Sequence, residues 1–177
     1  LVVASGAIFS VVGEKSKANE SFAILNDFKV GPTVVSTVDD TNGAGITFNE
    51  GAAKTVDIWE DPQCPVCNTF EQANGEFVED LVRAKKAKVV YHVLSFLGNE
   101  SVSAANAAYC AADEARYLDF HKAMYMVQPV LENSGFYSTE NLIKIGSYAG
   151  LTSQSFIDCV TKGSKLDKVR AAYESMG

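Results

Sequence analysis

The first half of the chain carries four short apolar runs rich in β-branched residues, a composition that is typical of strands. A turn-forming sequence, TNGAG, separates the first run from the second. The runs cover residues 34–38, 45–48, 54–60 and 87–97. Between the third and the fourth, apolar residues recur at helical spacing through about Lys86, which predicts a helix. The pattern therefore predicts the order β, β, β, α, β.

From about Asn99 the pattern changes and stays helical to the end of the chain. The Ala-rich stretch 101–128 has apolar residues at helical spacing, and three shorter helices are expected at 138–148, 153–162 and 164–176. The capping box SKLD opens the last of these helices. A β-rich half followed by a block of helices predicts an α/β core into which a helical subdomain is inserted.

The chain opens on an apolar segment, residues 1–13, whose first 12 residues carry no charge. This length is too short to span a bilayer, which needs roughly 20 residues. We interpret the segment as the end of a transmembrane anchor, with the remains of a signal peptide or an apolar element of the fold as alternatives. The anchor predicts a domain on the extracytoplasmic side of the cell membrane. A linker is expected at 14–31, the β/α part at 32–98 and the helical subdomain at 99–177.

The amino-acid composition and net charge disfavour some classes of binding partner for this protein. Of the 177 residues 47% are apolar, which is ordinary for a globular protein with a sizeable core. The formal net charge of −7 argues against nucleic acid or an anionic membrane surface as the main partner, because both require clustered Lys and Arg.

Cys64 and Cys67 lie where the third run passes into the helix, in the sequence WEDPQCPVCNTFEQ. A cysteine at a helix N-terminus is stabilised as a thiolate by unsatisfied backbone N–H groups and the helix dipole. Pro65 suits the first helical turn, where a missing N–H costs nothing. Cys67 then lies one turn inside the helix, within disulfide reach. This arrangement predicts a redox-active pair whose disulfide is a good oxidant.

Two other kinds of site fit the same motif less well. A purely structural bridge within it would remove little chain entropy and would strain the backbone. A zinc site would need a second pair of ligands, and the remaining candidates form no close pair: Cys110, Cys159, His92 and His121. We therefore expect neither a metal nor an organic cofactor. Cys110 and Cys159 could bridge each other in an oxidising compartment or stay buried thiols in a reducing one.

WEDPQCPVCNTFE resembles the active-site segment of the DsbA-like thiol–disulfide oxidoreductases, which have a thioredoxin fold with an inserted helical domain. AANAAYCAADEARYLDFHKAMY, LIKIGSYAGL and DCVTKGSKLDKVRAA resemble the inserted helices of the membrane-anchored actinobacterial members. The resemblance covers roughly residues 55–172 and implies an α/β, thioredoxin-like fold. It also implies a structural disulfide between Cys110 and Cys159, and it places His121 at the family's FH position. We interpret His121 as structural.

The resemblance implies a protein thiol–disulfide oxidoreductase, most simply an oxidase. A substrate thiolate attacks Cys64 with Cys67 as the leaving group, and a second substrate thiol resolves the mixed disulfide. The implied partners are secreted or membrane proteins with free thiols and a quinone-linked re-oxidase of the DsbB or vitamin K epoxide reductase type. A larger membrane complex is a further possible partner. The alternative function is that of a thioredoxin-like accessory subunit of such a complex, with little or no catalytic role.

Glu60 and Asp61 precede the cysteines, at positions where the family also has acids. A carboxylate near the buried cysteine could accept its proton during exchange. The alternative is that both are ordinary strand-end and turn residues.

The chain departs from the family pattern in two places. Val66 replaces the histidine of the most strongly oxidising members, so we expect a less oxidising pair, with isomerase and reductant roles left open. Thioredoxin folds also place a cis-proline opposite the cysteines, followed by a two-strand hairpin and a last helix. No proline follows the helical block, and we expect this segment of the fold to lie beyond Gly177. The alternative is a protein that lacks part of its substrate groove, which would put the activity in question.

Overall fold

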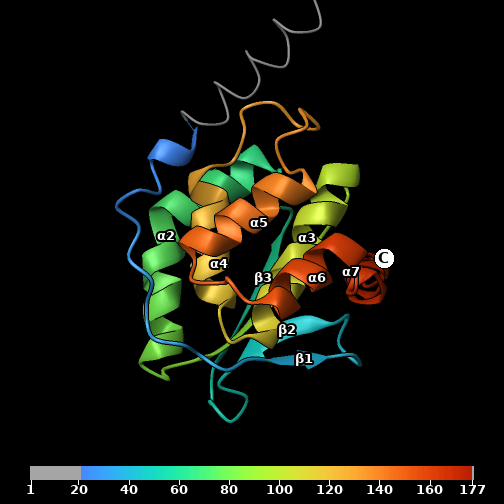
Figure 1. The fold of residues 1–177 in the computed structure, drawn as a ribbon. Coiled ribbons are helices and arrows are strands. Elements are labelled where there is room, and N and C mark those ends of the chain that lie inside the picture. Colours follow the sequence, from blue (N-terminus) through green and yellow to red (C-terminus); the bar gives the residue numbers. More distant parts are fainter. Residues whose placement is uncertain (1–20, 177) are drawn as a thin grey trace, which may run out of the picture.

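The computed structural model describes residues 21–176 (Figure 1). The anchor expected at 1–13 and the first part of the linker expected at 14–31 lie outside these residues. None of the helices within 21–176 is both long enough and apolar enough to cross a bilayer.

The β-rich half forms one mixed sheet in the order β1-β2-β4-β3. The strands β1 and β2 pair antiparallel, as do β2 and β4, whereas β3 and β4 run parallel from Thr55 opposite Lys88 to Glu60 opposite Val93. Helix α2 connects the two parallel strands, so the expected order β, β, β, α, β is confirmed. The strands are β1 (Thr37–Asp39), β2 (Gly45–Phe48), β3 (Thr55–Glu60) and β4 (Lys88–Val93), and α2 spans Pro65–Arg83.

The position of each strand explains its pattern. The inner strand β4 is buried at every residue after its first, as its continuous apolar run requires. At one edge of the sheet, β3 alternates instead, with Ile58 and Glu60 buried and Trp59 exposed on the other face. Glu60 is therefore a carboxylate that points into the protein at the end of its strand.

Five helices follow the sheet and form the inserted subdomain (Figure 1). The stretch expected to be helical at 101–128 forms two helices, because the chain turns at Ala115, which has a positive φ of 56°. Ser138 and Ser153 cap the N-termini of the next two helices through their side-chain oxygens. The prediction that a capping box opens the last helix is wrong, because that helix begins after Lys165, which makes no side-chain cap. The helices are α3 (Asn99–Asp113), α4 (Tyr117–Met126), α5 (Thr139–Tyr148), α6 (Gln154–Lys162) and α7 (Leu166–Glu174).

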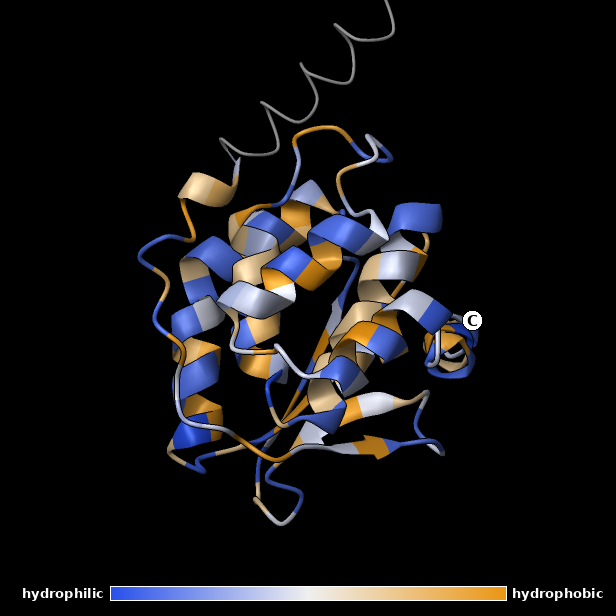
Figure 2. Cartoon of the chain, viewed as in Figure 1, coloured by the Kyte–Doolittle hydropathy of each residue, from blue (hydrophilic) through white to orange (hydrophobic). Residues whose placement is uncertain are grey.

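Small side chains let these helices pack closely. Helix α3 is buried over most of its length, and its alanines allow neighbouring helices to approach. By contrast, α2 has only Val78 and Val82 fully buried, and Figure 2 shows hydrophilic and hydrophobic positions alternating along it. Helix α2 thus covers the sheet with one face and leaves its other face and its N-terminus accessible.

Cys110 of α3 and Cys159 of α6 form a disulfide, with 2.05 Å between the sulfur atoms and 5.9 Å between the Cα atoms. This is the pair that the family resemblance implies. The bridge joins two helices of the inserted subdomain.

Candidate active site

Cys64 is the N-cap residue of α2, with φ −70° and ψ 118°, and its sulfur accepts the backbone N–H of Cys67 at 3.4 Å. Pro65 occupies the first helical turn, as expected. The sulfur of Cys64 thus lies where the free N–H groups of a helix point at an anion. Both cysteines are free thiols, and Val66 between them is largely exposed. A substrate can therefore reach this turn from solvent.

Cys67 lies in a different environment from Cys64. Burial raises the pKa of the Cys67 thiol to about 12, and the hydrogen bond with Cys64 and the negative charge of Glu60 act in the same direction. A hydrogen bond from the backbone of Asp61 opposes these effects only in part. Cys67 is therefore held as a thiol, and a reaction in which it attacks as a thiolate needs a base nearby.

The carboxylate of Asp61 holds the loop that enters the active-site turn. It is fully buried and accepts three hydrogen bonds, from Ser101 Oγ at 2.6 Å, from the Gln63 N–H at 2.9 Å and from the Leu97 N–H at 3.0 Å. Its backbone carbonyl accepts the Cys64 N–H at 2.9 Å. These hydrogen bonds hold the loop before α2 in place and so determine the position of Cys64 at the start of the helix. The expected part of Asp61 in proton transfer stays a prediction.

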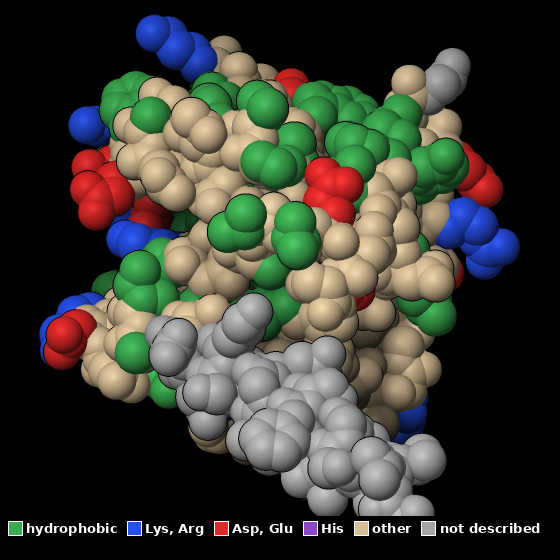
Figure 3. Space-filling model, turned by 90° about the horizontal axis from the view of Figure 1, so that it is seen from above, with side chains coloured by type: hydrophobic (Ala, Val, Ile, Leu, Met, Phe, Trp, Pro, Cys, Tyr) green, Lys and Arg blue, Asp and Glu red, His purple; other side chains and the backbone are tan. Residues whose placement is uncertain are grey.

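The loop between α4 and α5 closes over the same turn. The Gln128 side chain donates to the carbonyls of Pro62 at 2.8 Å and of Cys64 at 3.1 Å, and Gln63 accepts the Asn133 N–H at 2.7 Å. Two residues of this loop, Val130 and Leu131, are 93% and 71% exposed. Figure 3 shows hydrophobic side chains gathered at the end of the molecule that carries this loop and the start of α2. The inserted subdomain therefore both holds the cysteine turn and offers apolar surface near it.

Replacing Asp61 by Asn is expected to lower the free energy of unfolding by about 1–3 kcal/mol, the cost of leaving one buried donor without an acceptor. The amide can replace only one carboxylate oxygen as an acceptor, so its NH₂ group faces either Leu97 N–H or the donors on the other side. Urea unfolding measures the change. Asp80→Asn, at an exposed carboxylate of α2, is the matched control and should leave stability unchanged.

Glu60, Glu71 and His121 form a largely buried group, and the charge of Glu60 acts on the Cys67 thiol. His121 Nε2 shares a short hydrogen bond with Glu60 Oε1, and its Nδ1 lies 3.8 Å from Glu71 Oε2. The side chains come from β3, α2 and α4. One histidine nitrogen and one oxygen of each carboxylate all lie within 4.8 Å of one another. Among the described residues this is the group whose composition also suits a metal ion. The predicted site thus gains two members from elsewhere in the chain.

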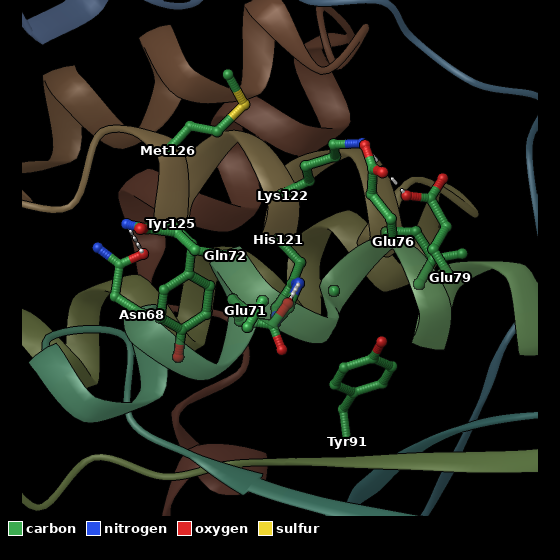
Figure 4. Close-up of a pocket in the computed structure, with 13 residues that line it drawn as sticks. Asn68, Glu71, Gln72, Glu76, Glu79, Tyr91, His121, Lys122, Tyr125 and Met126 are labelled. Carbon is green, nitrogen blue, oxygen red and sulfur yellow. Dashed lines mark hydrogen bonds and ion pairs between the residues drawn. The ribbon is translucent and has the colours of Figure 1, made fainter.

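A cavity of about 220 Å³ lies beside this group, between α2 and α4. Figure 4 shows the His121 ring next to Glu71, with the Tyr91 hydroxyl pointing towards the same space. At the outer side of the cavity, the Lys122 ammonium lies 3.7 Å from carboxylate oxygens of both Glu76 and Glu79. The cavity connects the buried group with charged residues nearer the surface.

His121 carries a positive charge in this setting. Burial by itself lowers the pKa of a histidine, but the charges of Glu60 and Glu71 outweigh it and raise the pKa of His121 to about 9. Burial also raises the pKa of Glu71, although the His121 charge works against this. At neutral pH the ring is therefore an imidazolium between two carboxyl groups.

Sequence reasoning placed Cys64, Cys67, Pro65, Glu60 and Asp61 together, and the structure has them in one turn and its preceding strand end. It did not identify Glu71, which lies one helical turn beyond Cys67 on the same face of α2. The spacing of four residues between Cys67 and Glu71 predicts that both lie on one helix face, and it could have identified Glu71 from the sequence. The zinc alternative would have drawn on Cys110 and Cys159, which are bonded to each other.

The fold and this turn define a thioredoxin-like α/β protein with an inserted helical subdomain and a cysteine pair at a helix N-terminus. A family model described as thioredoxin matches residues 42–176, which is more than half of the chain. The chain belongs to this thioredoxin family.

The solved structures most informative for the site come from Mycobacterium tuberculosis. The reduced disulfide bond oxidoreductase DsbG is 26% identical with a TM-score of 0.63, over 72% of this chain and 70% of that one. Oxidised DsbA is 27% identical with a TM-score of 0.63, over 71% and 73%. The thiol–disulfide oxidoreductase MdbA of Corynebacterium matruchotii has a TM-score of 0.72 over 89% and 81%, and at 21% identity it shows the fold alone. The resemblance to DsbA-like proteins is confirmed.

Among curated proteins the chain is similar to the serine/threonine-protein kinase PknE of Mycobacterium tuberculosis and Mycobacterium bovis. This chain and each kinase are 29% identical over an alignment of 126 residues, which covers 65% of this chain. The chain spans 22% of the length of these kinases.

Proposed function

We propose that this protein is a thiol–disulfide oxidoreductase that exchanges a Cys64–Cys67 disulfide with the thiols of substrate proteins, in the direction of substrate oxidation. The observation that carries the proposal is the cysteine pair itself. One sulfur caps the N-terminus of α2 and faces solvent, and the other is held as a thiol one turn inside. Relatives with the same fold and more than a quarter of their residues identical are disulfide oxidoreductases by name.

The reaction balances within this pair and two substrate thiols. A substrate thiolate attacks Cys64 Sγ, the Cys64–Cys67 bond breaks, and Cys67 leaves with the bonding electrons and takes up a proton. A second substrate thiolate then attacks the substrate sulfur of the mixed disulfide and releases Cys64 as a thiolate. The substrate loses two electrons, and the enzyme gains them as two thiols. Glu60, whose charge acts on the Cys67 thiol, is the proposed proton donor and acceptor.

The proposal extends to where the protein works and what re-oxidises it. A disulfide such as that between Cys110 and Cys159 is typical of proteins that fold in an oxidising compartment. We therefore place the domain on the extracytoplasmic side of the cell membrane, with secreted or membrane proteins as substrates. A quinone-linked membrane enzyme of the DsbB or vitamin K epoxide reductase type would return the pair to its disulfide.

The reduction potential of the Cys64–Cys67 pair tests the direction of exchange. Glutathione titration of the purified protein, with the thiols counted by mass spectrometry, is expected to give a value of about −120 to −180 mV, the range of disulfide donors. Val66 in place of a histidine should put it at the less oxidising end of this range. A potential near that of thioredoxin, about −270 mV, would instead make the protein a reductant.

The similarity to part of a protein kinase favours a second candidate, a thioredoxin-like module that serves as an accessory part of a larger membrane protein or complex. Trapping separates the two. With Cys67 replaced by Ser, an oxidase should accumulate mixed disulfides with many client proteins. An accessory module should co-purify with one stable complex whether or not its cysteines are present.

A further inference from the structure

Glu60, His121 and Glu71 form a largely buried triad of ionisable side chains. His121, the middle member, has no role in the thiol exchange described above. His121 lies between Glu60 and Glu71, and each of its ring nitrogens faces a different carboxylate. The side chains of Glu60 and His121 are only 3% and 5% exposed. Charges taken this far from water persist only when they are paired, so the ring and the Glu60 carboxylate stabilise each other as ions.

Within residues 21–176, the charges that act most strongly on the ring are those of carboxylates, Glu60, Glu71 and Glu79. Tyrosine rings pack around His121, with ring centroids 5.0 Å away for Tyr91, 5.3 Å for Tyr117 and 5.0 Å for Tyr125. The titratable groups that interact with it come from the elements packed against it: Glu60 on β3, Glu71 and Glu79 on α2, Tyr91 on β4, and Tyr117 and Tyr125 on α4. The neighbouring cation, Lys122, pairs with Glu76 and Glu79 at the outer side of the cavity. The imidazolium is thus the positive charge that compensates Glu60.

One carboxylate oxygen of Glu60 makes no hydrogen bond among the described residues and is available to accept a proton. Its Oε1 accepts the hydrogen bond of His121, whereas Oε2 is buried and has no hydrogen-bond partner among the described residues. Glu60 acts electrostatically on the thiol of Cys67, so the two groups lie close enough to interact. An ionised carboxylate with a free oxygen beside a thiol of raised pKa has the properties of a general base.

We propose that His121 is a positioning residue for thiol exchange: clamped between Glu60 and Glu71 as an imidazolium, it keeps Glu60 ionised and aims the free Oε2 at the proton of Cys67. This rests on the proposed function. In the step that closes the active-site disulfide, the Cys67 proton moves to Glu60, the sulfur attacks Cys64 Sγ, and the partner thiolate leaves. In the opposite direction Glu60 returns the proton to Cys67. His121 neither gains nor loses a proton in either direction.

Nitrogen NMR of the imidazole rings tests the charge of His121 without any reaction. The chain has two histidines, and His92→Gln assigns the signals by removing one set. His121 is expected to show two protonated nitrogens throughout the neutral range and to lose a proton only near pH 9. A neutral ring at pH 7 would overturn the proposal.

The closing step is measured on the mixed disulfide between Cys64 and glutathione, in which Cys67 is a free thiol. The rate of glutathione release is followed as a function of pH. In His121→Gln the rate at pH 7 should fall by about tenfold or more, within the range of general-base contributions. The acidic limb of its pH profile should move to higher pH, because the buried carboxylate now takes up a proton instead of staying charged. His121→Lys, which restores a cation, should recover most of the wild-type rate.

A double variant keeps the test valid if His121→Gln is unstable. Glu60→Gln removes the base, and adding His121→Gln to it removes the imidazolium without leaving an unpaired carboxylate at Glu60. If His121 acts through Glu60, the double variant should be as slow as Glu60→Gln alone. A further slowing in the double variant, or an unchanged pH profile in His121→Gln, would show a purely structural role and overturn the proposal.

Two more outcomes are informative. Stoichiometric zinc in the purified wild-type protein, lost in His121→Gln, would mean that a metal rather than the ring proton compensates the carboxylates, and would overturn the proposal. A wild-type protein that never closes its Cys64–Cys67 disulfide would overturn the proposed function itself. A wild-type protein that closes it normally, with His121→Gln indistinguishable from it, would remove only the role of His121.

Discussion

Replacing Cys64 by Ser is expected to reduce thiol–disulfide exchange to the uncatalysed background. The Cys64 sulfur caps the start of α2, where a substrate can reach it, and a serine hydroxyl can neither form a disulfide nor leave as a stable anion. The measurement is the oxidation of a reduced dithiol peptide by the oxidised protein, followed by mass spectrometry. Because Cys64 is partly exposed, the free energy of unfolding should stay close to that of the reduced wild-type protein.

Cys67→Ser is the matched control for this prediction. It keeps the attacking sulfur, so reduced Cys67→Ser should still take up one molecule of a disulfide such as oxidised glutathione and should then stop at the mixed disulfide. Residual exchange in Cys64→Ser comparable to wild type would assign the reactive sulfur to Cys67. That result would contradict the roles given to the two residues by the position of Cys64 at the start of α2 and by the raised pKa of the Cys67 thiol.

The sequence allowed the fold and the cysteine pair to be predicted because both depend on local signals. Strand runs, helical periodicity and capping residues act over a few neighbouring positions, and the CPVC motif with its proline describes a helix start by itself. The turn between α3 and α4 was missed, because the Ala-rich pattern continues through it. The chain turns between the two helices at Ala115, and no local residue preference predicts the positive φ of this alanine.

The rest of the site depends on contacts between distant positions. His121 lies 61 residues from Glu60 in the sequence, and the hydrogen bond between them exists because α4 packs beside the end of β3. A histidine on an aromatic helix face is more often structural, so its position alone gave no reason to connect it with Cys67. In the same way, Gln128 and Asn133 look like ordinary loop residues until the loop is seen to close over the cysteine turn.

Replacing Cys110 and Cys159 together by Ala is expected to lower the free energy of unfolding by about 4 kcal/mol on the chain-entropy model. The bridge closes a loop of 49 residues, and without it the unfolded chain regains the freedom that the loop had removed. For a protein of this size the melting temperature should fall by roughly 8–16 °C. Thermal and urea unfolding of the two proteins under non-reducing conditions measure the difference. The matched control replaces Cys64 and Cys67 by Ala, which removes a far smaller loop and should change stability much less.

Exchange by the Cys64–Cys67 pair should survive the loss of the second bridge. Cys110 lies nine residues along α3 from Ser101, the residue of that helix that holds Asp61, and this separation corresponds to roughly 13 Å along the helix axis. The contacts that hold the cysteine turn come from the start of α3 and from the end of α4 with its following loop, and none of them involves Cys159. A variant that keeps its stability but loses exchange would show that the Cys110–Cys159 pair takes part in the redox chemistry. Reduced stability with intact exchange would establish it as a structural bridge within the inserted subdomain, which keeps the helices around the active site assembled while the Cys64–Cys67 pair is repeatedly opened and closed.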